Sequence, residues 1–388
     1  MDYQAIARKY RPDRFDAVVG QEVIGRTLAN AIRAGRVHHA FLFTGPRGVG
    51  KTSTARILAK GLTCAEGPTS EPCGRCEHCI MVAQGSHPDV IEIDAARFNS
   101  VETIRQLADD AGFQPVRARL RIVILDEVHM LSTAAWNALL KLVEEPPPHL
   151  KFIFATTEVD KVLPTVVSRC QRFDFRALDQ EAIVRRLAAI CVSEGRELGE
   201  AVLARIARAA GGGMRDAQTL LDQLLAVTEP GADAAGDLDL LLGAARAGSV
   251  RAILDQVIAG ASGPALTGLD SALADGVAPA TLLDQLIDQV RGMVLVQACG
   301  PDTPLVRRLG LDAEAIRTQA AACDPARTLR LAQVLLHAQG QLRHGGDPRL
   351  LIELALVRLA QSAAMVDMET LVRRLERLEA PPGPPRPP

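Results

Sequence analysis

The sequence is poor in aromatic residues, which make up 3% of its 388 positions and include a single tryptophan. Apolar residues still account for 48% of the chain, so its hydrophobic cores must be built largely from Leu, Val, Ile and Ala. A chain of this length is expected to fold as two or three domains, and we find no internal repeat.

An excess of charge of either sign is also missing. The 44 basic residues are nearly balanced by 46 acidic ones, which gives a formal net charge of -2. A free-standing nucleic-acid-binding protein normally presents a basic face, so this balance argues against that class. It leaves open a contact with DNA through a local surface or inside an assembly.

Signals for export and membrane insertion are absent from the sequence. Residues 1–4 contain no apolar segment of a secretory signal, and no uncharged run approaches the roughly 18 apolar residues of a membrane span. Eight cysteines in such a chain are expected to be reduced thiols or metal ligands and not disulfides. We therefore expect a cytoplasmic protein with no membrane partner.

Four short apolar segments have the composition of buried strands. They lie at residues 40–44, 90–94, 121–125 and 151–156. Helical patterns, such as those at 22–34 and 52–62, separate them, and this alternation predicts a parallel α/β sheet. After about residue 178 only helical periodicity continues. It covers residues 179–192, 200–228 with a break at Gly211–Gly213, 281–299, 326–342 and 350–363.

Residues 45–52 read Gly-Pro-Arg-Gly-Val-Gly-Lys-Thr and match the phosphate-binding pattern G-x-x-x-x-G-K-[ST] at every defined position. A predicted strand precedes them and a predicted helix follows, which is the context that such a loop requires. Backbone N–H groups then hold the phosphates, Lys51 reaches the β- and γ-phosphates, and the Thr52 hydroxyl binds Mg²⁺. The alternative is a chance match in an ordinary loop.

An acidic pair, Asp126 and Glu127, follows the apolar segment 121–125. Ligands bind at the carboxyl ends of strands in open α/β sheets, so these side chains are expected beside the phosphates. Asp126 would coordinate Mg²⁺ directly or indirectly, and Glu127 would polarise an attacking water as general base. The alternative is a pair of solvated acids at the start of a helix. The pattern predicts an NTP hydrolase.

Four cysteines with metal-site spacing follow the loop. They are Cys64, Cys73, Cys76 and Cys79. Four thiolates can close a tetrahedral structural zinc site, with His78 or His87 as a substitute for one of them. Catalytic zinc would need an open coordination position and acid–base groups, which nothing nearby suggests. The remaining alternative is a set of buried thiols without a metal.

Together these motifs resemble the bacterial DNA polymerase III gamma/tau subunits, AAA+ ATPases of the sliding-clamp loader. The resemblance covers about residues 1–365 and is strongest from Tyr3 to Arg215. Besides the loop and the cysteines, it rests on the strings ARKYRP (7–12), VVGQ (18–21), LDEVHML (125–131), NALLK (137–141), EEPP (144–147), ATTE (155–158) and SRC (168–170).

The resemblance assigns further roles. It implies that Thr156 senses the γ-phosphate, that Arg169 is an arginine finger reaching a neighbouring subunit's ATP, and that Arg215 is a second sensor from a helical lid. Such a finger makes hydrolysis depend on assembly. Without the resemblance, both arginines read as surface residues. The implied nucleotide-binding set is Arg8, Tyr10, Arg11, Val18, Val19, Gly45, Gly48, Val49, Gly50, Lys51, Thr52, Ser53 and Arg215.

For some positions the sequence leaves two interpretations open. Tyr10 and Arg11 either border the adenine or pack the N-terminal arm. Arg97 and Phe98 stand where the family usually has a serine and a polar residue, so no role is assigned to this loop. Arg105, on the helix that follows, either faces DNA in the ring or lies on a solvated helix face.

The implied architecture is an α/β P-loop AAA+ domain with a structural zinc insert, followed by a helical lid and an all-α C-terminal collar domain. The expected boundaries are 1–178 with the insert at 64–79, 179–240 for the lid, 241–370 for the collar and 371–388 for a proline-rich linker.

The implied function is ATP-driven loading of the β sliding clamp onto primed DNA within the DNA polymerase III holoenzyme. The implied cofactors are ATP, Mg²⁺ and Zn²⁺. The implied partners are the delta and delta-prime subunits, further gamma/tau copies, the clamp and primer–template DNA; a longer form would add the polymerase core and the helicase. Rival interpretations are a branch-migration motor, which the cysteine insert disfavours, and a non-catalytic scaffold, which the intact Lys51 and Glu127 disfavour.

Overall fold

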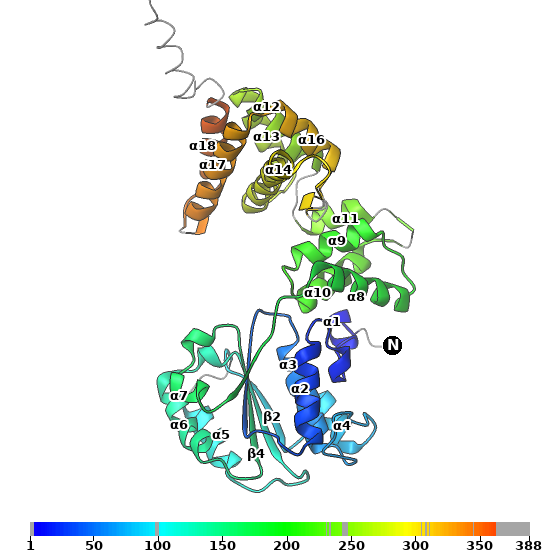
Figure 1. The fold of residues 1–388 in the computed structure, drawn as a ribbon, viewed down its shortest axis with the longest axis vertical. Coiled ribbons are helices and arrows are strands. Elements are labelled where there is room, and N and C mark those ends of the chain that lie inside the picture. Colours follow the sequence, from blue (N-terminus) through cyan, green and yellow to red (C-terminus); the bar gives the residue numbers. More distant parts are fainter. Residues whose placement is uncertain are drawn as a thin grey trace, which may run out of the picture. The chain divides into compact units, whose positions relative to one another are not determined.

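The computed structural model describes residues 4–97, 101–229, 231–232, 234–242, 247–303, 305–306, 309, 311–343 and 345–361. The chain divides into two compact units, residues 1–234 and 235–388, and each is described by itself (Figure 1). The proline-rich segment expected at 371–388 and Phe98 lie outside the described residues. In the part of the chain that is described, no helix has the length and apolar character needed to cross a membrane.

A five-stranded parallel sheet forms the centre of the first unit, with the strand order β2-β3-β4-β1-β5. The strands are β1 (Ala40–Thr44), β2 (Val90–Asp94), β3 (Arg121–Asp126), β4 (Leu150–Thr156) and β5 (Gln171–Asp174). The four strands predicted from apolar runs are confirmed, with β3 and β4 each longer by a residue. The sequence does not predict β5, because Phe173 is its only buried residue.

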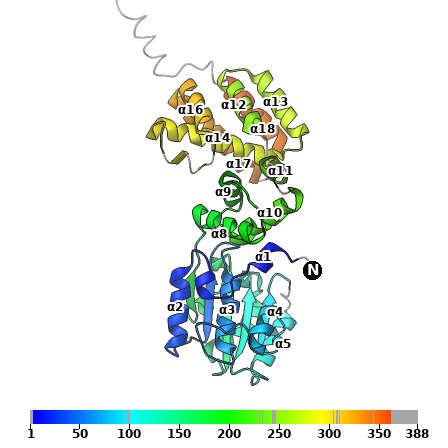
Figure 2. The ribbon, with the colours of Figure 1, turned by 90° about the vertical axis from the view of Figure 1, so that its right-hand side faces the viewer.

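Helices cover both faces of this sheet. They are α2 (Glu22–Arg33), α3 (Lys51–Thr63), α4 (Glu77–Gln84), α5 (Val101–Ala111), α6 (Thr133–Glu144) and α7 (Pro164–Val167), with short 3₁₀ turns at Phe15–Ala17, Val128–Met130 and Val159–Lys161. Side chains of β1 alternate between two apolar layers: Phe41 and Phe43 pack with α2, α3 and α4, whereas Ala40 and Leu42 pack with α5, α6 and α7. Burial on both faces explains why the strands read as continuous apolar runs. Figure 2 looks onto the layer that contains α2 and α3.

The N-terminal arm, which contains α1 and precedes the 3₁₀ turn at Phe15–Ala17, and three lid helices complete the first unit. The helices are α1 (Ile6–Lys9), α8 (Gln180–Ser193), α9 (Glu200–Ala209) and α10 (Met214–Val227). The predicted interruption at Gly211–Gly213 is confirmed, and the positive φ of Gly211 (57°) and Gly212 (89°) explains why glycines stand there. After this break, the backbone N–H of Arg215 donates to the Gly48 carbonyl at 3.3 Å, which joins α10 to the phosphate loop.

The second unit is helical throughout its described residues. Helix α11 (Ala234–Leu241) begins where the first unit ends, and α12 (Ala247–Ile258), α13 (Ser262–Ala274), α14 (Pro279–Cys299), α16 (Ala313–Ala322), α17 (Pro325–Arg343) and α18 (Pro348–Gln361) follow. The predicted helices at 281–299, 326–342 and 350–363 correspond to α14, α17 and α18. Their core is mostly aliphatic and also holds a buried hydrogen bond of 2.7 Å from Gln289 to Gln319.

Candidate functional site

The phosphate loop joins β1 to α3 at the carboxyl edge of the sheet. Gly50 caps α3 with a φ of 104°, a left-handed conformation that glycine adopts without strain. Gly45 is equally constrained, because a Cβ added to it would lie 2.3 Å from the carbonyl oxygen of Phe175. The glycines of the motif therefore allow the backbone to turn tightly and to leave its N–H groups at the N-terminus of α3.

Lys51 folds back over the loop. Its Nζ donates hydrogen bonds to the carbonyl oxygens of Gly45 and Pro46, both at 2.7 Å, and the residue is only 6% exposed. Burial lowers the pKa of Lys51, while the carboxylates of Glu127 and Asp126 oppose that shift. Two neutral carbonyl acceptors therefore hold the ammonium inside the loop. An anion that binds there can replace them as its hydrogen-bond partner.

Thr52 and Asp126 meet across the cleft. The Thr52 hydroxyl donates to Oδ2 of Asp126 at 2.6 Å, although the two residues come from different elements. β3 brings Asp126 to this edge, where it is aligned with Asp94 of β2. A hydroxyl and a carboxylate side by side are oxygen ligands of the type that Mg²⁺ prefers. The predicted magnesium pair is therefore brought together.

Glu127 adopts a left-handed backbone conformation with a φ of 49°, and no other described non-glycine residue has a positive φ. Such strain costs free energy and is commonly kept at functional sites. Its N–H donates to Oδ1 of Asp126 at 3.0 Å, and its Oε2 accepts from the Thr157 hydroxyl at 3.1 Å. The conformation directs the Glu127 carboxylate into the cleft beside Lys51.

A buried histidine connects Glu127 to the end of β4. Nδ1 of His129 lies 3.4 Å from Oε2 of Glu127 and 3.1 Å from the Thr156 hydroxyl, and its Nε2 lies 3.3 Å from Oε1 of Glu158. Thr156 is fully buried and also accepts from the Glu158 N–H at 3.0 Å. The predicted sensor threonine therefore contacts this histidine and does not line the cleft itself.

The cleft is closed by the N-terminal arm on one side and by α10 on the other. Open mouth included, it measures about 930 Å³, a volume typical of small-molecule sites. Of the residues predicted from the sequence, it is lined by Tyr10, Arg11, Val18, Val19, Gly48, Val49, Gly50, Lys51, Thr52, Ser53, Asp126, Glu127 and Arg215.

The arm is fixed to the lid helices by contacts across a long stretch of sequence. The Tyr10 hydroxyl and Lys9 Nζ both donate to Oε1 of Glu194, at 2.7 and 2.8 Å. Arg186 donates to the Tyr10 carbonyl at 3.3 Å and also lines the cleft. Tyr10 therefore anchors the arm through its hydroxyl and is also among the residues that line the cleft, and its place beside an adenine stays a prediction.

Besides Thr156, three residues predicted for the nucleotide site lie outside the cleft wall. Gly45 contributes its carbonyl to Lys51, whereas Arg8 lines a neighbouring cavity. Arg169 follows α7, is 40% exposed, and pairs with Glu144 at 3.0 Å. The structure does not bring Arg169 to the cleft of its own chain.

Several cleft residues are not found by sequence reasoning. They are Ala7, Pro12, Ala17, Arg47, Leu178, Arg186, Met214 and Gln218. The sequence marks the region of Leu178 only as a helix boundary and that of Gln218 only as the interior of a helix. Neither residue therefore carries a signal for a binding site. Arg47 had a usable signal, because it stands inside the phosphate loop, and Met214 directly follows the break at Gly211–Gly213.

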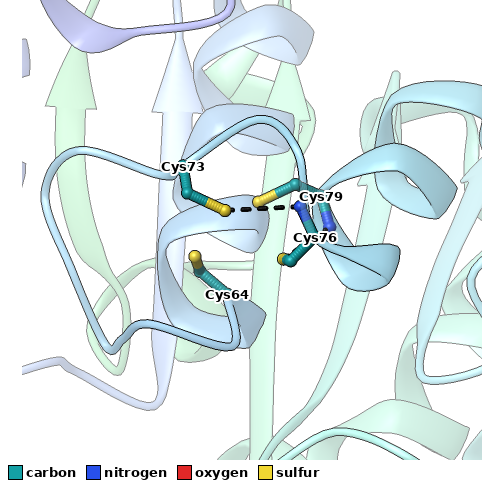
Figure 3. A group of neighbouring side chains, drawn as sticks. All are labelled: Cys64, Cys73, Cys76 and Cys79. Carbon is teal, nitrogen blue, oxygen red and sulfur yellow. Dashed lines mark hydrogen bonds between the residues drawn. The ribbon is translucent and has the colours of Figure 1, made fainter.

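The four cysteines converge on one point beside the sheet (Figure 3). Cys64 ends α3, Cys76 and Cys79 lie at the start of α4, and the Sγ atoms of the four residues all lie within 4.8 Å of one another. Four sulfurs bound to one zinc at about 2.3 Å lie roughly 3.8 Å apart, so this donor set fits the ion. None of the eight cysteines, all of which lie in described parts of the chain, forms a disulfide.

The thiols of the cluster differ in their electrostatics, because burial and the neighbouring Cys76 and Cys64 side chains raise the pKa of Cys79. Burial raises the pKa of Cys76, but hydrogen bonds from the backbone of Ala65 and Cys79 outweigh this and lower it to about 7. The two histidines kept as substitute ligands contact each other instead, with His78 Nδ1 2.8 Å from His87 Nε2. The cysteine set alone therefore forms the candidate metal site.

The same architecture occurs in known proteins. Family models match three consecutive stretches: "DNA polymerase III, delta subunit" at residues 20–179, "DNA polymerase III clamp loader subunit, ATPase lid domain" at 182–230, and "DNA polymerase III subunits gamma and tau domain III" at 234–375. The DNA polymerase III subunit tau of Bacillus subtilis is 38% identical over 387 residues, which are 97% of this chain and 67% of that protein. This chain belongs to the DNA polymerase III gamma/tau family.

Other gamma/tau proteins agree with this assignment. The Mycobacterium tuberculosis subunit is 42% identical over 96% of this chain and 65% of its own length, and the Escherichia coli tau subunit is 39% identical over 92% and 55%. The chain thus spans about two thirds or less of these gamma/tau relatives. The structure of the Thermotoga maritima RuvB Holliday junction branch migration motor matches 80% of this chain and 91% of its own, with 16% sequence identity and a TM-score of 0.41. A structural similarity this low adds nothing to the family assignment.

Proposed function

We propose that this gamma/tau family member is an ATPase of the AAA+ class, with the cleft of the first unit as its ATP site. The observation that carries the proposal is the grouping of Lys51, Thr52, Asp126 and Glu127 at one edge of the sheet, beside a glycine-rich loop at a helix N-terminus. Arg215 lines the lid side of the same cleft, which supports the proposal that it contacts a phosphate as the second sensor.

Each side chain has a distinct task. Lys51 would exchange its two carbonyl partners for the β- and γ-phosphates, because a hydrogen bond from an ammonium to a charged oxygen is stronger than one to a neutral carbonyl. Thr52 and Asp126 would hold Mg²⁺, which offsets phosphate charge when bound. Glu127 would accept the proton of the attacking water, with Thr157 keeping its carboxylate in place. Tyr10, Arg11, Val18 and Val19 would border the base.

We further propose that the chain acts in a ring. The family models and relatives are named for clamp-loader and polymerase III subunits, which supports delta, delta-prime and further gamma/tau copies as partners. In such a ring Arg169 would reach the ATP of a neighbour. The outcome would be loading of the β sliding clamp onto primer–template DNA in the cytoplasm. The boundaries 1–178, 179–240 and 241–370 remain our proposed domain division, with Zn²⁺ in the cysteine site as a structural ion.

The test is steady-state ATP turnover by the purified chain, alone and with delta, delta-prime, the clamp and primed DNA. We expect turnover that rises when all partners are present. Glu127→Gln should keep ATP binding and lower turnover by about a hundredfold or more, because it removes the general base and keeps the side-chain shape. Wild-type turnover that is absent, or indifferent to every partner, would contradict the proposal.

A further inference from the structure

Gln218 of α10 places an amide in the wall of the nucleotide cleft. The residue is only 5% exposed, and no hydrogen bond joins its side chain to a partner in the described part of the chain. Neither amide atom is sealed off by protein, so the accessible part of this side chain is the part that faces the cleft. The amide therefore keeps both its donor and its acceptor for a molecule that fills the cleft.

The direction of α10 places Gln218 away from the phosphate end of the cleft. At the start of the helix, the Arg215 N–H donates to the Gly48 carbonyl of the phosphate loop at 3.3 Å. Gln218 follows one turn later, and after one more turn Oδ2 of Asp222 accepts from the Ile6 N–H of the N-terminal arm at 3.3 Å. Residues three and four apart share one face of a helix. Gln218 therefore lies between the phosphate loop and the arm, where the base is proposed to bind.

The other side chains at this end of the cleft offer little that could recognise the edge of a base. Val18 and Val19 are apolar, and the Tyr10 hydroxyl already donates to Glu194 at 2.7 Å. The remaining polar side chains of the wall carry a charge or are the two hydroxyls in the first turn of α3. Among the described residues of the wall, Gln218 supplies the only amide, which presents a donor beside an acceptor in one plane.

We propose that Gln218 is the specificity-determining residue for the base and that its amide selects adenine over guanine. The proposal rests on the proposed function, in which this cleft binds ATP. Adenine presents an amino donor at N6 beside an acceptor at N7, and one glutamine amide can pair with both. Guanine presents two acceptors, O6 and N7, at the same edge. One of these acceptors would face the amide oxygen of Gln218, and two acceptors in contact repel each other.

The apolar part of the wall cannot make this distinction. Contacts between aliphatic side chains and the faces of a purine ring are nearly the same for adenine and guanine, because the two rings share their shape. A site built around a hydrogen-bonding group rejects a ligand that leaves this group unpaired, and it does so more strongly than an apolar pocket rejects a poor fit. The choice between the two purines therefore depends on a polar group at the base edge, and Gln218 is the side chain in that position.

Isothermal titration of the full chain with ADP, GDP and purine riboside 5′-diphosphate, in the presence of Mg²⁺, tests the proposal. The third ligand is ADP without its 6-amino group. We expect the wild type to bind ADP about tenfold more tightly than either of the other two. Gln218→Met keeps the length of the side chain but removes the amide, so it should bind ADP about tenfold more weakly and purine riboside 5′-diphosphate with nearly unchanged affinity. Gln223→Met makes the same change at an exposed position of α10 outside the cleft wall and should match the wild type.

Two results would overturn the inference. One is equal affinity of the wild type for ADP and purine riboside 5′-diphosphate, a comparison that needs no variant. The other is a loss of affinity in Gln218→Met that is the same for both ligands, because this would indicate a packing role. If Gln218→Met does not fold, as judged by circular dichroism, Gln218→Asn replaces it; this amide is shorter by one methylene and should also lose the preference for ADP.

The titration reads binding without turnover, so two kinds of failure can be told apart. A wild type that binds none of the three nucleotides contradicts the proposed ATP site, and the role of Gln218 with it. A wild type that binds ADP, with a preference that does not depend on Gln218, contradicts only the role of Gln218.

Discussion

The guanidinium of Arg169 lies 3.0 Å from the carboxylate of Glu144, so the residue proposed to act on a neighbour's ATP is paired within its own chain. Its Nη1 also donates to the Thr165 carbonyl at 2.9 Å. The two paired side chains are 40% and 44% exposed, and ion pairs at such positions contribute only about 0–1 kcal/mol. The ion pair with Glu144 can therefore be exchanged for a phosphate contact at little cost, as the proposed finger role of Arg169 requires.

Arg169→Ala should leave ATP binding unchanged and lower partner-stimulated turnover by about a thousandfold, as loss of an arginine finger does. Nucleotide affinity and turnover in the assembled complex are the measurements. Arg172→Ala is the matched control, because it removes a surface arginine paired with Asp174 nearby. Equal stimulated turnover in Arg169→Ala and the wild type would remove the finger assignment.

His129→Phe should lower the turnover number by about tenfold or more while the ATP dissociation constant changes little. The phenylalanine ring keeps the buried volume, but it loses the contacts of His129 with Glu127 and Glu158, so the general base is no longer held. His129→Asn should restore part of the rate, because its amide can still contact the Glu127 carboxylate. A Phe variant with a normal rate, or one with weakened ATP binding alone, would show that this histidine serves only packing.

Local sequence was sufficient for the parts of the site that are contiguous in the chain. Lys51 and Thr52 follow the glycines of the phosphate loop at the start of α3, and Asp126 ends an apolar strand, so all three could be placed at one edge of the sheet. The link from His129 to Thr156 could not be predicted, since it depends on β3 and β4 being neighbours. The sequence of an apolar strand does not show which other strand will lie beside it in the sheet.

Other features depend on contacts between distant segments. The Tyr10 hydroxyl meets Glu194 only because the N-terminal arm packs on the lid helices, and Glu194 belongs to none of the recognised motifs. Gln218 reads as an ordinary polar position in α10, since a place in the wall of the cleft cannot be inferred from helical periodicity alone. β5 is short and polar, and it is a strand because β1 offers it a free edge.

Metal analysis should find about one zinc per chain, and replacing both Cys73 and Cys76 by serine should abolish it. Loss of the ion should lower the thermal midpoint by about 2–4 °C for each kcal/mol lost, because the 64–79 insert is no longer closed on the end of α3. Cys299→Ser, at an exposed cysteine outside the cluster, should keep both the zinc and the midpoint. A folded wild-type protein without metal would contradict the assignment.

Asp89 is a fully buried carboxylate that organises the segment leading into β3. Its Oδ1 accepts from the Val116 N–H at 2.7 Å, and its Oδ2 accepts from the N–H groups of Arg117 and Ala118 at 2.7 and 2.8 Å. Burial raises the pKa of Asp89, but these three backbone hydrogen bonds outweigh burial and hold it below its usual value. The charged form is therefore the one that stabilises the fold.

Asp89→Asn should lower the free energy of unfolding at pH 7 by about 1–3 kcal/mol, because an amide donor then faces backbone donors. A carboxyl with a lowered folded-state pKa contributes stability that is fully present above its unfolded pKa of about 3.9 and is lost as pH falls through the folded value. The difference between wild type and variant should accordingly be constant from pH 7 to pH 5 and shrink below about pH 4. Urea unfolding at several pH values measures it, with the exposed Asp109→Asn as control; a difference that persists unchanged at the lowest pH would mean that the charge of Asp89 does not stabilise the fold.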